Sequence, residues 1–158
     1  IAAYQGWAQN QTKPKVIVAY ETMWGSTEKM ARKIVQGITD SGIEVKLFDA
    51  ALSDRTEALT EMLDAKGFVF GSSTHDNGML TTLAAFLHFL KGLKPKNRLA
   101  CAFGSYGWAG GAVKEIEENL AQAGIEIAQS PLAVQYVPSS DELLRCYEFG
   151  RDFASKIK

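Results

Sequence analysis

Short apolar runs alternate with stretches of helical periodicity along most of this chain. The run Val16–Tyr20 is continuously apolar, which is typical of a strand buried on both faces. Met30, Ile34 and Ile38 then recur at the spacing of a helix, which Gly42 ends. Further apolar runs, each followed by a segment of helical periodicity, continue along the chain, so five strands are expected to alternate with five helices. The predicted strands are residues 16–20, 43–48, 67–72, 99–103 and a last one in two pieces, 125–128 and 132–137, interrupted around Ser130 and Pro131.

Two helix starts carry a recognisable signal. Asp54 with Glu57, and Ser139 with Glu142, have the spacing of a capping box, and the first of these helices is predicted to run through Ala65. Strands that alternate with helices predict a parallel sheet covered on both faces. Right-handed crossovers leave two common strand orders, 2-1-3-4-5 and the dinucleotide-binding order. In both, ligands bind beyond the carboxyl ends of the strands.

Composition limits the class of protein. The 158 residues include 46% hydrophobic and 22% charged residues, as expected for one globular domain. The net charge, 17 − 18 = −1, argues against a nucleic-acid partner, and no apolar run reaches the ~18–20 residues that span a membrane. Cys101 and Cys146 form no CxxC pair, and no zinc-ligand spacing occurs. We therefore expect a cytoplasmic protein without a metal site of its own.

The first fourteen residues differ from the rest. Residues 1–14 are polar and lack a sustained period, which predicts a linker or the trailing end of an upstream element, with a frayed terminus as the alternative. The chain begins with Ile1 rather than Met, so we expect a piece of something longer. Residues 15–158 form the predicted domain.

The loop after the first strand contains three hydroxyls around one glycine. Thr22, Ser26 and Thr27 flank Gly25, and a helix follows directly. Free N–H groups at a helix start bind anions. Residues 16–28 contain no Lys or Arg and lack the GxxxxGK[ST] pattern, so this is not a nucleotide-hydrolysing P-loop. The loop suits a phosphate monoester held by neutral donors, although helix capping alone also favours Ser and Thr.

Two further loops complete the predicted site. Residues 72–78 are polar and contain His75, but no adjacent nucleophile accompanies it, so no catalytic residue is predicted. Residues 104–111 combine glycines with Tyr106 and Trp108, and aromatic side chains beside polar loops fit a planar ring. Phosphate at the first loop and a ring between the other two describe a site for flavin mononucleotide (FMN).

Three segments also resemble a known family. Thr22–Thr27 resembles the phosphate loop of flavodoxins, from which Trp24 departs at the third position. The longer strings 20–31, 71–80 and 103–112 are similar to the C-terminal flavodoxin-like domain of flavo-diiron proteins. The resemblance covers residues 15–158 and implies a flavodoxin-like fold with the order 2-1-3-4-5.

The resemblance also implies a function. In that family, FMN relays electrons from a carrier such as rubredoxin to a diiron centre on a separate domain, which reduces O2 or NO, and the proteins form head-to-tail dimers. The diiron ligands would lie outside this chain. The residues expected to bind FMN are Thr22, Met23, Trp24, Gly25, Ser26 and Thr27 at the phosphate, Ser73, Thr74, His75, Asp76, Asn77 and Gly78 on one side of the ring, and Ser105, Tyr106, Gly107, Trp108, Gly110 and Gly111 on the other.

Three alternatives remain from sequence alone. A free-standing flavodoxin would usually be strongly acidic, whereas this chain is nearly neutral. An NAD(P)H-dependent quinone reductase of the same fold would need a pyridine-nucleotide platform, and none is recognisable. A flavin-free receiver module would need an acidic pair after the first strand and a phospho-acceptor Asp after the third, which Glu21 and Asp76 match poorly.

Overall fold

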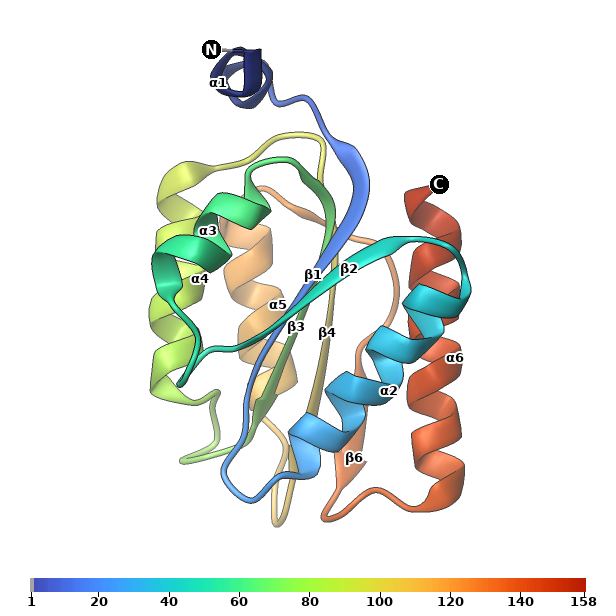
Figure 1. The fold of residues 1–158 in the computed structure, drawn as a ribbon. Coiled ribbons are helices and arrows are strands. Elements are labelled where there is room, and N and C mark those ends of the chain that lie inside the picture. The colour runs from blue at the N-terminus through green and yellow to red at the C-terminus, as the bar shows by residue number, and fades with distance from the viewer. Residues whose placement is uncertain (1) are drawn as a thin grey trace.

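A computed structural model describes residues 2–158 and shows a parallel sheet between two layers of helices (Figure 1). The strand order is β2-β1-β3-β4-β5, and β6 also pairs with β4. The predicted fold class is therefore confirmed. The strands are β1 (Lys13–Glu21), β2 (Glu44–Asp49), β3 (Ala65–Ser73), β4 (Leu99–Tyr106), β5 (Glu126–Ile127) and β6 (Leu132–Gln135). The helices are α1 (Ala2–Ala8), α2 (Ser26–Asp40), α3 (Arg55–Met62), α4 (Thr81–Leu93), α5 (Ala112–Gln122) and α6 (Ser140–Ile157).

Two hydrophobic cores lie on opposite faces of the sheet. Successive side chains of β1 alternate between them: Ile17 and Ala19 belong to one core, Val16 and Val18 to the other. Helices α3, α4 and α5 cover the first face, and α2 and α6 cover the second (Figure 1). Because both faces are covered, the central strands are apolar throughout, as the sequence pattern indicates.

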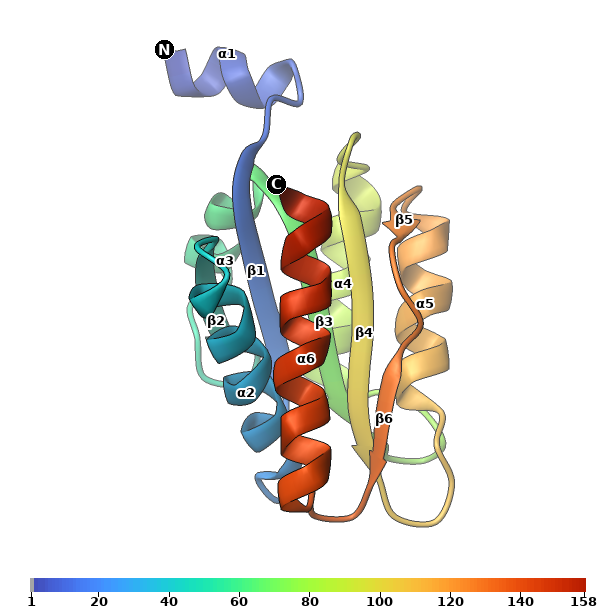
Figure 2. The same ribbon diagram turned by 90° about the vertical axis from the view of Figure 1, so that its right-hand side faces the viewer.

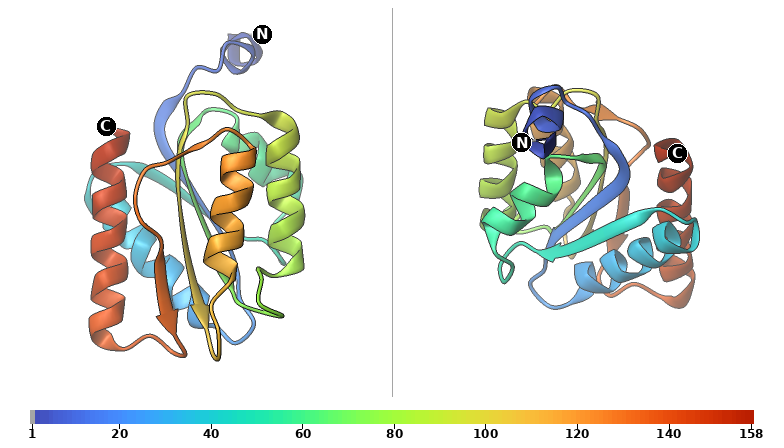
Figure 3. Two further views of the ribbon diagram at one scale, coloured as in Figure 1. Left: turned by 180° about the vertical axis from the view of Figure 1, so that it is seen from behind. Right: turned by 45° about the horizontal axis from the view of Figure 1, so that its top comes forward.

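Three features differ from the sequence-based expectations. Residues 2–8 are helical rather than irregular, and α1 lies beyond the amino ends of the strands (Figures 2 and 3). Strand β1 begins at Lys13, two residues before the predicted domain start, because Lys13 N–H donates to the Asp64 carbonyl. Helix α3 ends at Met62 instead of Ala65, since Ala65 already pairs in β3. The division into a tail and a domain stays a prediction.

The last predicted strand is indeed split. Strands β5 and β6 both pair with β4, on either side of Ser130 and Pro131 (Figure 2). Proline lacks the N–H that a ladder needs, which accounts for the interruption. The following helix begins with the predicted capping box, since Ser139 and Glu142 form both reciprocal bonds. Asp54 forms one bond of the other predicted box, accepting from Glu57 N–H at 3.0 Å.

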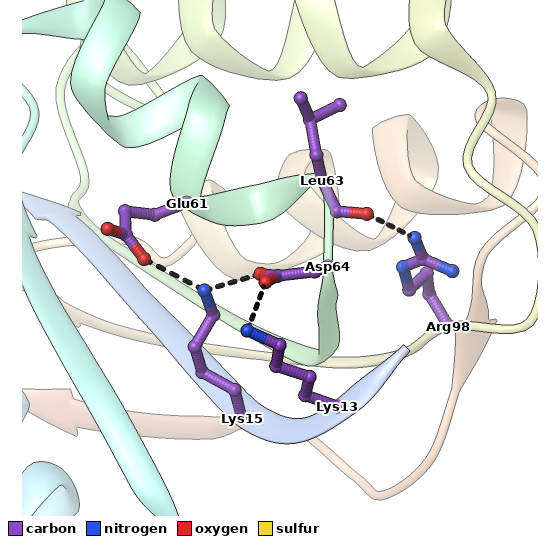
Figure 4. Close-up of polar contacts among 6 residues, drawn as sticks. All are labelled: Lys13, Lys15, Glu61, Leu63, Asp64 and Arg98. Carbon is purple, nitrogen blue, oxygen red and sulfur yellow. Dashed lines mark hydrogen bonds and ion pairs between the residues drawn. The ribbon is translucent and has the colours of Figure 1, made fainter. Parts of the chain in front are cut away.

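A cluster of charged residues closes the amino edge of the sheet (Figure 4). We call Lys13, Lys15, Glu61 and Asp64 the amino-edge ion cluster. Lys15 is 3% exposed, and its Nζ lies 2.8 Å from Glu61 Oε2 and 2.5 Å from Asp64 Oδ1. Lys13 Nζ lies 3.1 Å from Asp64 Oδ2. Burial opposes both charges, but the hydrogen bonds outweigh it, so the pKa of Lys15 is raised and the pKa of Asp64 is lowered.

Arg98 forms hydrogen bonds to the loops that precede β3 and β4. Its guanidinium is buried and donates to the carbonyls of Leu63, at 2.8 Å, and Lys96 (Figure 4 shows the first contact). Lys96 N–H in turn donates to Asn10 Oδ1 at 3.2 Å. The segment before β1 is thereby tied to the loops that precede β3 and β4.

Candidate functional site

The three loops singled out in the sequence follow β1, β3 and β4 and meet at the carboxyl edge of the sheet, opposite α1 (Figure 1). In the order β2-β1-β3-β4-β5, all strands run parallel, but successive strands are added on one side of β1 and then on the other. Ligands of such sheets bind at this switch point between β1 and β3. The sheet order, rather than any single residue, therefore brings the loops together.

The first loop presents backbone donors at the start of α2. Gly25 precedes the helix with φ of +92°, a left-handed conformation that favours glycine. Its N–H donates to Thr22 Oγ1 at 3.0 Å, which closes the turn. No side chain caps the described start of α2, so the first N–H groups of the helix point out of its end. Together with the helix dipole they form a site for an anion.

The first turn of α2 is anchored to β1. Tyr20 Oη donates to Glu28 Oε1 at 3.1 Å, and Arg32 Nη2 donates to the same oxygen at 3.0 Å. Burial, followed by the bond to Glu28, raises the pKa of Tyr20 to about 12, so the phenol keeps its proton at neutral pH. Arg32, followed by Tyr20, lowers the pKa of Glu28. These bonds fix the direction in which α2 leaves the sheet.

Three hydroxyls join the loops behind this helix start. Thr27 Oγ1 lies 2.8 Å from both Ser73 Oγ and Ser105 Oγ, and all three side chains are buried. Met23 N–H also donates to Ser73 Oγ at 3.3 Å. The ends of β3 and β4 are therefore hydrogen-bonded to α2. Thr27 faces inward and connects the loops, and its predicted contact with phosphate stays a prediction.

The second loop folds into a two-residue hairpin. His75 and Gly78 exchange both backbone hydrogen bonds at 2.9 Å, and Asp76 and Asn77 between them have φ of +49° and +62°. Positive φ at both central residues is the signature of a type I′ turn. The side chains of His75 and Asp76 are exposed, with Nδ1 and Oδ2 3.3 Å apart.

The third loop packs against the second. Gly111 lies so close to Asn77 that an added Cβ would be 1.9 Å from the Asn77 carbonyl oxygen. Since φ at Gly111 is −169°, the glycine is needed for close approach and not for its backbone angle. Trp108, at the tip of the loop, is 98% exposed, and Trp24 in the first loop is 89% exposed. Two large aromatic side chains thus project at the rim, where a flat ligand would bury them.

The loops enclose an open groove of about 640 Å³, within the usual range for small-molecule sites. It is lined by Met23, Trp24, Ser26, Ser73, Thr74, Asp76, Asn77, Ser105, Tyr106, Gly107, Trp108, Ala109, Tyr136 and Val137. The other predicted residues, Thr22, Gly25, Thr27, His75, Gly78, Gly110 and Gly111, belong to the same loops without lining the groove. Among the described residues that line it, none is Lys or Arg.

Tyr136 and Val137 were missed by the sequence reasoning. They follow β6, and Tyr136 N–H donates to the Tyr106 carbonyl at 2.7 Å, which brings the end of β6 beside the third loop. A signal was available, because the predicted last strand ended at Val137 and its carboxyl end had to reach the same edge as the other loops.

The sheet is parallel and has the order of flavodoxins, and the groove at its switch point is lined by hydroxyl and aromatic side chains. These features define a protein of the flavin-nucleotide-binding flavodoxin class. The chain belongs to the flavodoxin family, whose sequence profile matches residues 18–150. Family membership implies that the cofactor is FMN, as predicted.

Known relatives show which group of flavodoxin-like domains this chain resembles. The chain is 48% identical to a nitric oxide reductase of Moorella thermoacetica, over 99% of this chain and 40% of that protein. It superposes with a TM-score of 0.93 on rubredoxin oxygen:oxidoreductase from Desulfovibrio gigas, at 34% identity, over 98% of this chain and 38% of the other. It superposes on the flavodiiron protein of Giardia intestinalis with a TM-score of 0.90 at 28% identity, over 99% of this chain and 39% of the other. The resemblance to the flavodoxin-like domain of flavo-diiron proteins is confirmed.

The chain spans about two fifths of the length of these relatives. Within residues 2–158, no group of three or more His, Cys, Asp and Glu side chains is arranged to hold a metal ion. No helix in the described part of the chain is long and apolar enough to cross a membrane.

Proposed function

We propose that this chain is the FMN-carrying electron-transfer domain of a flavodiiron oxidoreductase. In this proposal, it accepts electrons from a small redox carrier such as rubredoxin and passes them to a diiron centre on a separate domain, where O2 or NO is reduced. The observation that carries the proposal is the groove at the carboxyl edge, which combines the backbone donors at the start of α2 with hydroxyl and aromatic side chains of the three loops.

The residues of the groove fit FMN. When bound, FMN supplies reversible uptake and release of electrons. At the phosphate end, the free N–H groups of α2 and the hydroxyl of Ser26 offer neutral donors to an anion. Tyr106 and Trp108 in the third loop, and Trp24 in the first loop, offer apolar faces to a planar ring. No side chain needs to act as an acid or base in this function.

The names of the relatives support the proposed partners. One relative is a nitric oxide reductase and another a rubredoxin oxygen:oxidoreductase, and this chain accounts for about two fifths of each. A diiron domain elsewhere in the whole protein, and rubredoxin as the electron donor, agree with these names. A cytoplasmic location belongs to the same proposal, and the free, buried state of Cys101 and Cys146 agrees with a reducing compartment.

A homodimer is also part of the proposal. Helix α1 lies beyond the amino ends of the strands, whereas the groove lies at their carboxyl ends (Figures 1 and 2). The nine residues of β1 separate the two by about 30 Å at ~3.3 Å per residue. A domain joined to α1 would therefore sit far from the flavin of its own chain, and a second copy offers a shorter route.

The test is an absorbance spectrum of the purified chain after incubation with FMN or with riboflavin, followed by desalting. We expect the flavin bands to survive with FMN and to be lost with riboflavin, which lacks the phosphate. Ser26→Ala should weaken FMN binding and leave the weaker riboflavin binding unchanged, whereas Ser53→Ala, in the loop after β2, should alter neither. Loss of both flavins from the unaltered chain would refute the proposal.

A further inference from the structure

Glu115 contacts the second loop from a different element. It lies in the first turn of α5, and its Oε2 accepts a hydrogen bond from Met79 N–H at 2.6 Å. Met79 directly follows the hairpin that ends at Gly78. A Cβ added to Gly78 would lie 2.5 Å from the same carboxylate oxygen, so the carboxylate occupies the space beside that glycine. One side chain thus both accepts from the backbone and packs against the closing residue of the turn.

Two further contacts join the start of α5 to this loop. Gly111 packs against the Asn77 carbonyl, as described above, and Ala112 N–H donates to Thr74 Oγ1 at 3.4 Å. The hairpin is therefore held on both sides of its turn, by Thr74 before it and by Glu115 after it. Of these contacts, the bond from Met79 to Glu115 is the shortest and the only charge-assisted one within the described residues.

The turn gains from such support. Asp76 and Asn77 both have positive φ, which Asp and Asn tolerate better than other side chains but less readily than glycine, so contacts on both sides of the turn help to hold it. The same two residues line the groove. A shift of the hairpin would therefore move one wall of the site while leaving the phosphate end, built on α2, in place.

We propose that Glu115 is a positioning residue: its carboxylate fixes the Asp76–Asn77 turn and thereby sets the affinity of the groove for the flavin ring. The effect on flavin affinity rests on the proposed FMN function, whereas the effect on the turn rests only on the contact between Glu115 and Met79. The two effects are measured separately.

The contact is tested in the flavin-free chain by amide hydrogen exchange at Met79. Glu115→Ala removes the acceptor, and Glu115→Asp keeps the charge but shortens the side chain, so both should accelerate exchange at Met79 roughly tenfold or more. Glu115→Gln keeps an acceptor oxygen and should stay within about twofold of the unaltered chain. Glu118→Gln is the matched control, because Glu118 lies on the same helix in an exposed pair with Lys114. Unchanged exchange in both the Ala and Asp variants would overturn the inference.

The consequence is tested by titrating the same variants with FMN. We expect the Kd to rise roughly fivefold or more in the Ala and Asp variants, with rescue in the Gln variant, since only a fraction of molecules would then hold the turn in its binding conformation. A merely structural role would lower thermal stability in all variants without this rescue. Equal FMN affinity in all variants would overturn the inference. Absence of FMN binding in the unaltered chain would refute the proposed function, and the hydrogen-exchange result alone would then decide whether Glu115 holds the turn.

Discussion

Replacing Lys15 with Met tests how the amino-edge ion cluster contributes to stability. The substitution keeps the length of a side chain that is 3% exposed and removes the ammonium group between Glu61 and Asp64. Removing one partner of a fully buried ion pair costs about 3–5 kcal/mol. Here the Asp64 and Glu61 side chains are 20% and 33% exposed, and Asp64 keeps Lys13. We therefore expect Lys15→Met to lower the free energy of unfolding by about 1–3 kcal/mol at pH 7.

The pH dependence gives the sharper signature. The pKa of Asp64 is lowered in the folded protein, so its stabilising contribution is present above the pKa of the unfolded chain and is lost as pH falls through the folded value. The pKa of Lys15 is raised, so its contribution is present below the unfolded pKa and is lost as pH rises through the folded value. The cost of Lys15→Met should therefore be greatest at neutral pH and smaller at both extremes.

Urea unfolding at a series of pH values measures this cost. Lys13→Met is the matched control, because the Lys13 side chain is 67% exposed and its pair with Asp64 should contribute at most about 1 kcal/mol. A double-mutant cycle of Lys15→Met with Asp64→Asn isolates the pairwise energy. A cost for Lys15→Met that equals that of Lys13→Met, or that does not vary with pH, would refute the reasoning.

Two further predictions concern the site and the last helix. Gly111→Ala places a Cβ against the Asn77 carbonyl, which has no flexible end to move, so FMN binding should weaken roughly tenfold or more in a fluorescence titration. Gly92→Ala, with nothing within 4 Å of its added Cβ, is the control and should leave binding unchanged; equal affinities would contradict the close packing. Ser139→Ala removes half of the capping box and should lower the free energy of unfolding by about 1 kcal/mol, as measured in urea. The neighbouring Ser140→Ala should cost much less, and an equal cost would argue against the cap.

The sequence predicts the fold because both of its periodicities are strong. Apolar runs such as Val16–Tyr20 occur only where both faces of a strand are covered, and Met30, Ile34 and Ile38 give a clear helical face. The three loops stand out since glycines and hydroxyls gather at the ends of the strands. Resemblance then supplies the strand order that periodicity leaves open.

What the sequence does not predict depends on side-chain direction and on contacts between distant segments. Thr27 faces Ser73 and Ser105 because of how α2 is rotated, and a hydroxyl in a loop carries no sign of that rotation. Tyr136 reaches the groove through a strand split in two, and Glu115 reaches Met79 across 36 positions. The helix at residues 2–8 is short, and such helices depend on context more than on propensity.

The split of the last strand has a consequence for self-association. An exposed strand edge with unpaired backbone groups invites pairing with a second chain and, in time, aggregation. Here one edge of the sheet consists of a two-residue and a four-residue strand separated by Pro131, which is too short and too interrupted to template a neighbour. The opposite edge, β2, carries the charged residues Glu44 and Lys46. We therefore expect a stable assembly of this domain to form through its loops or helices rather than by extending its sheet from one molecule into the next.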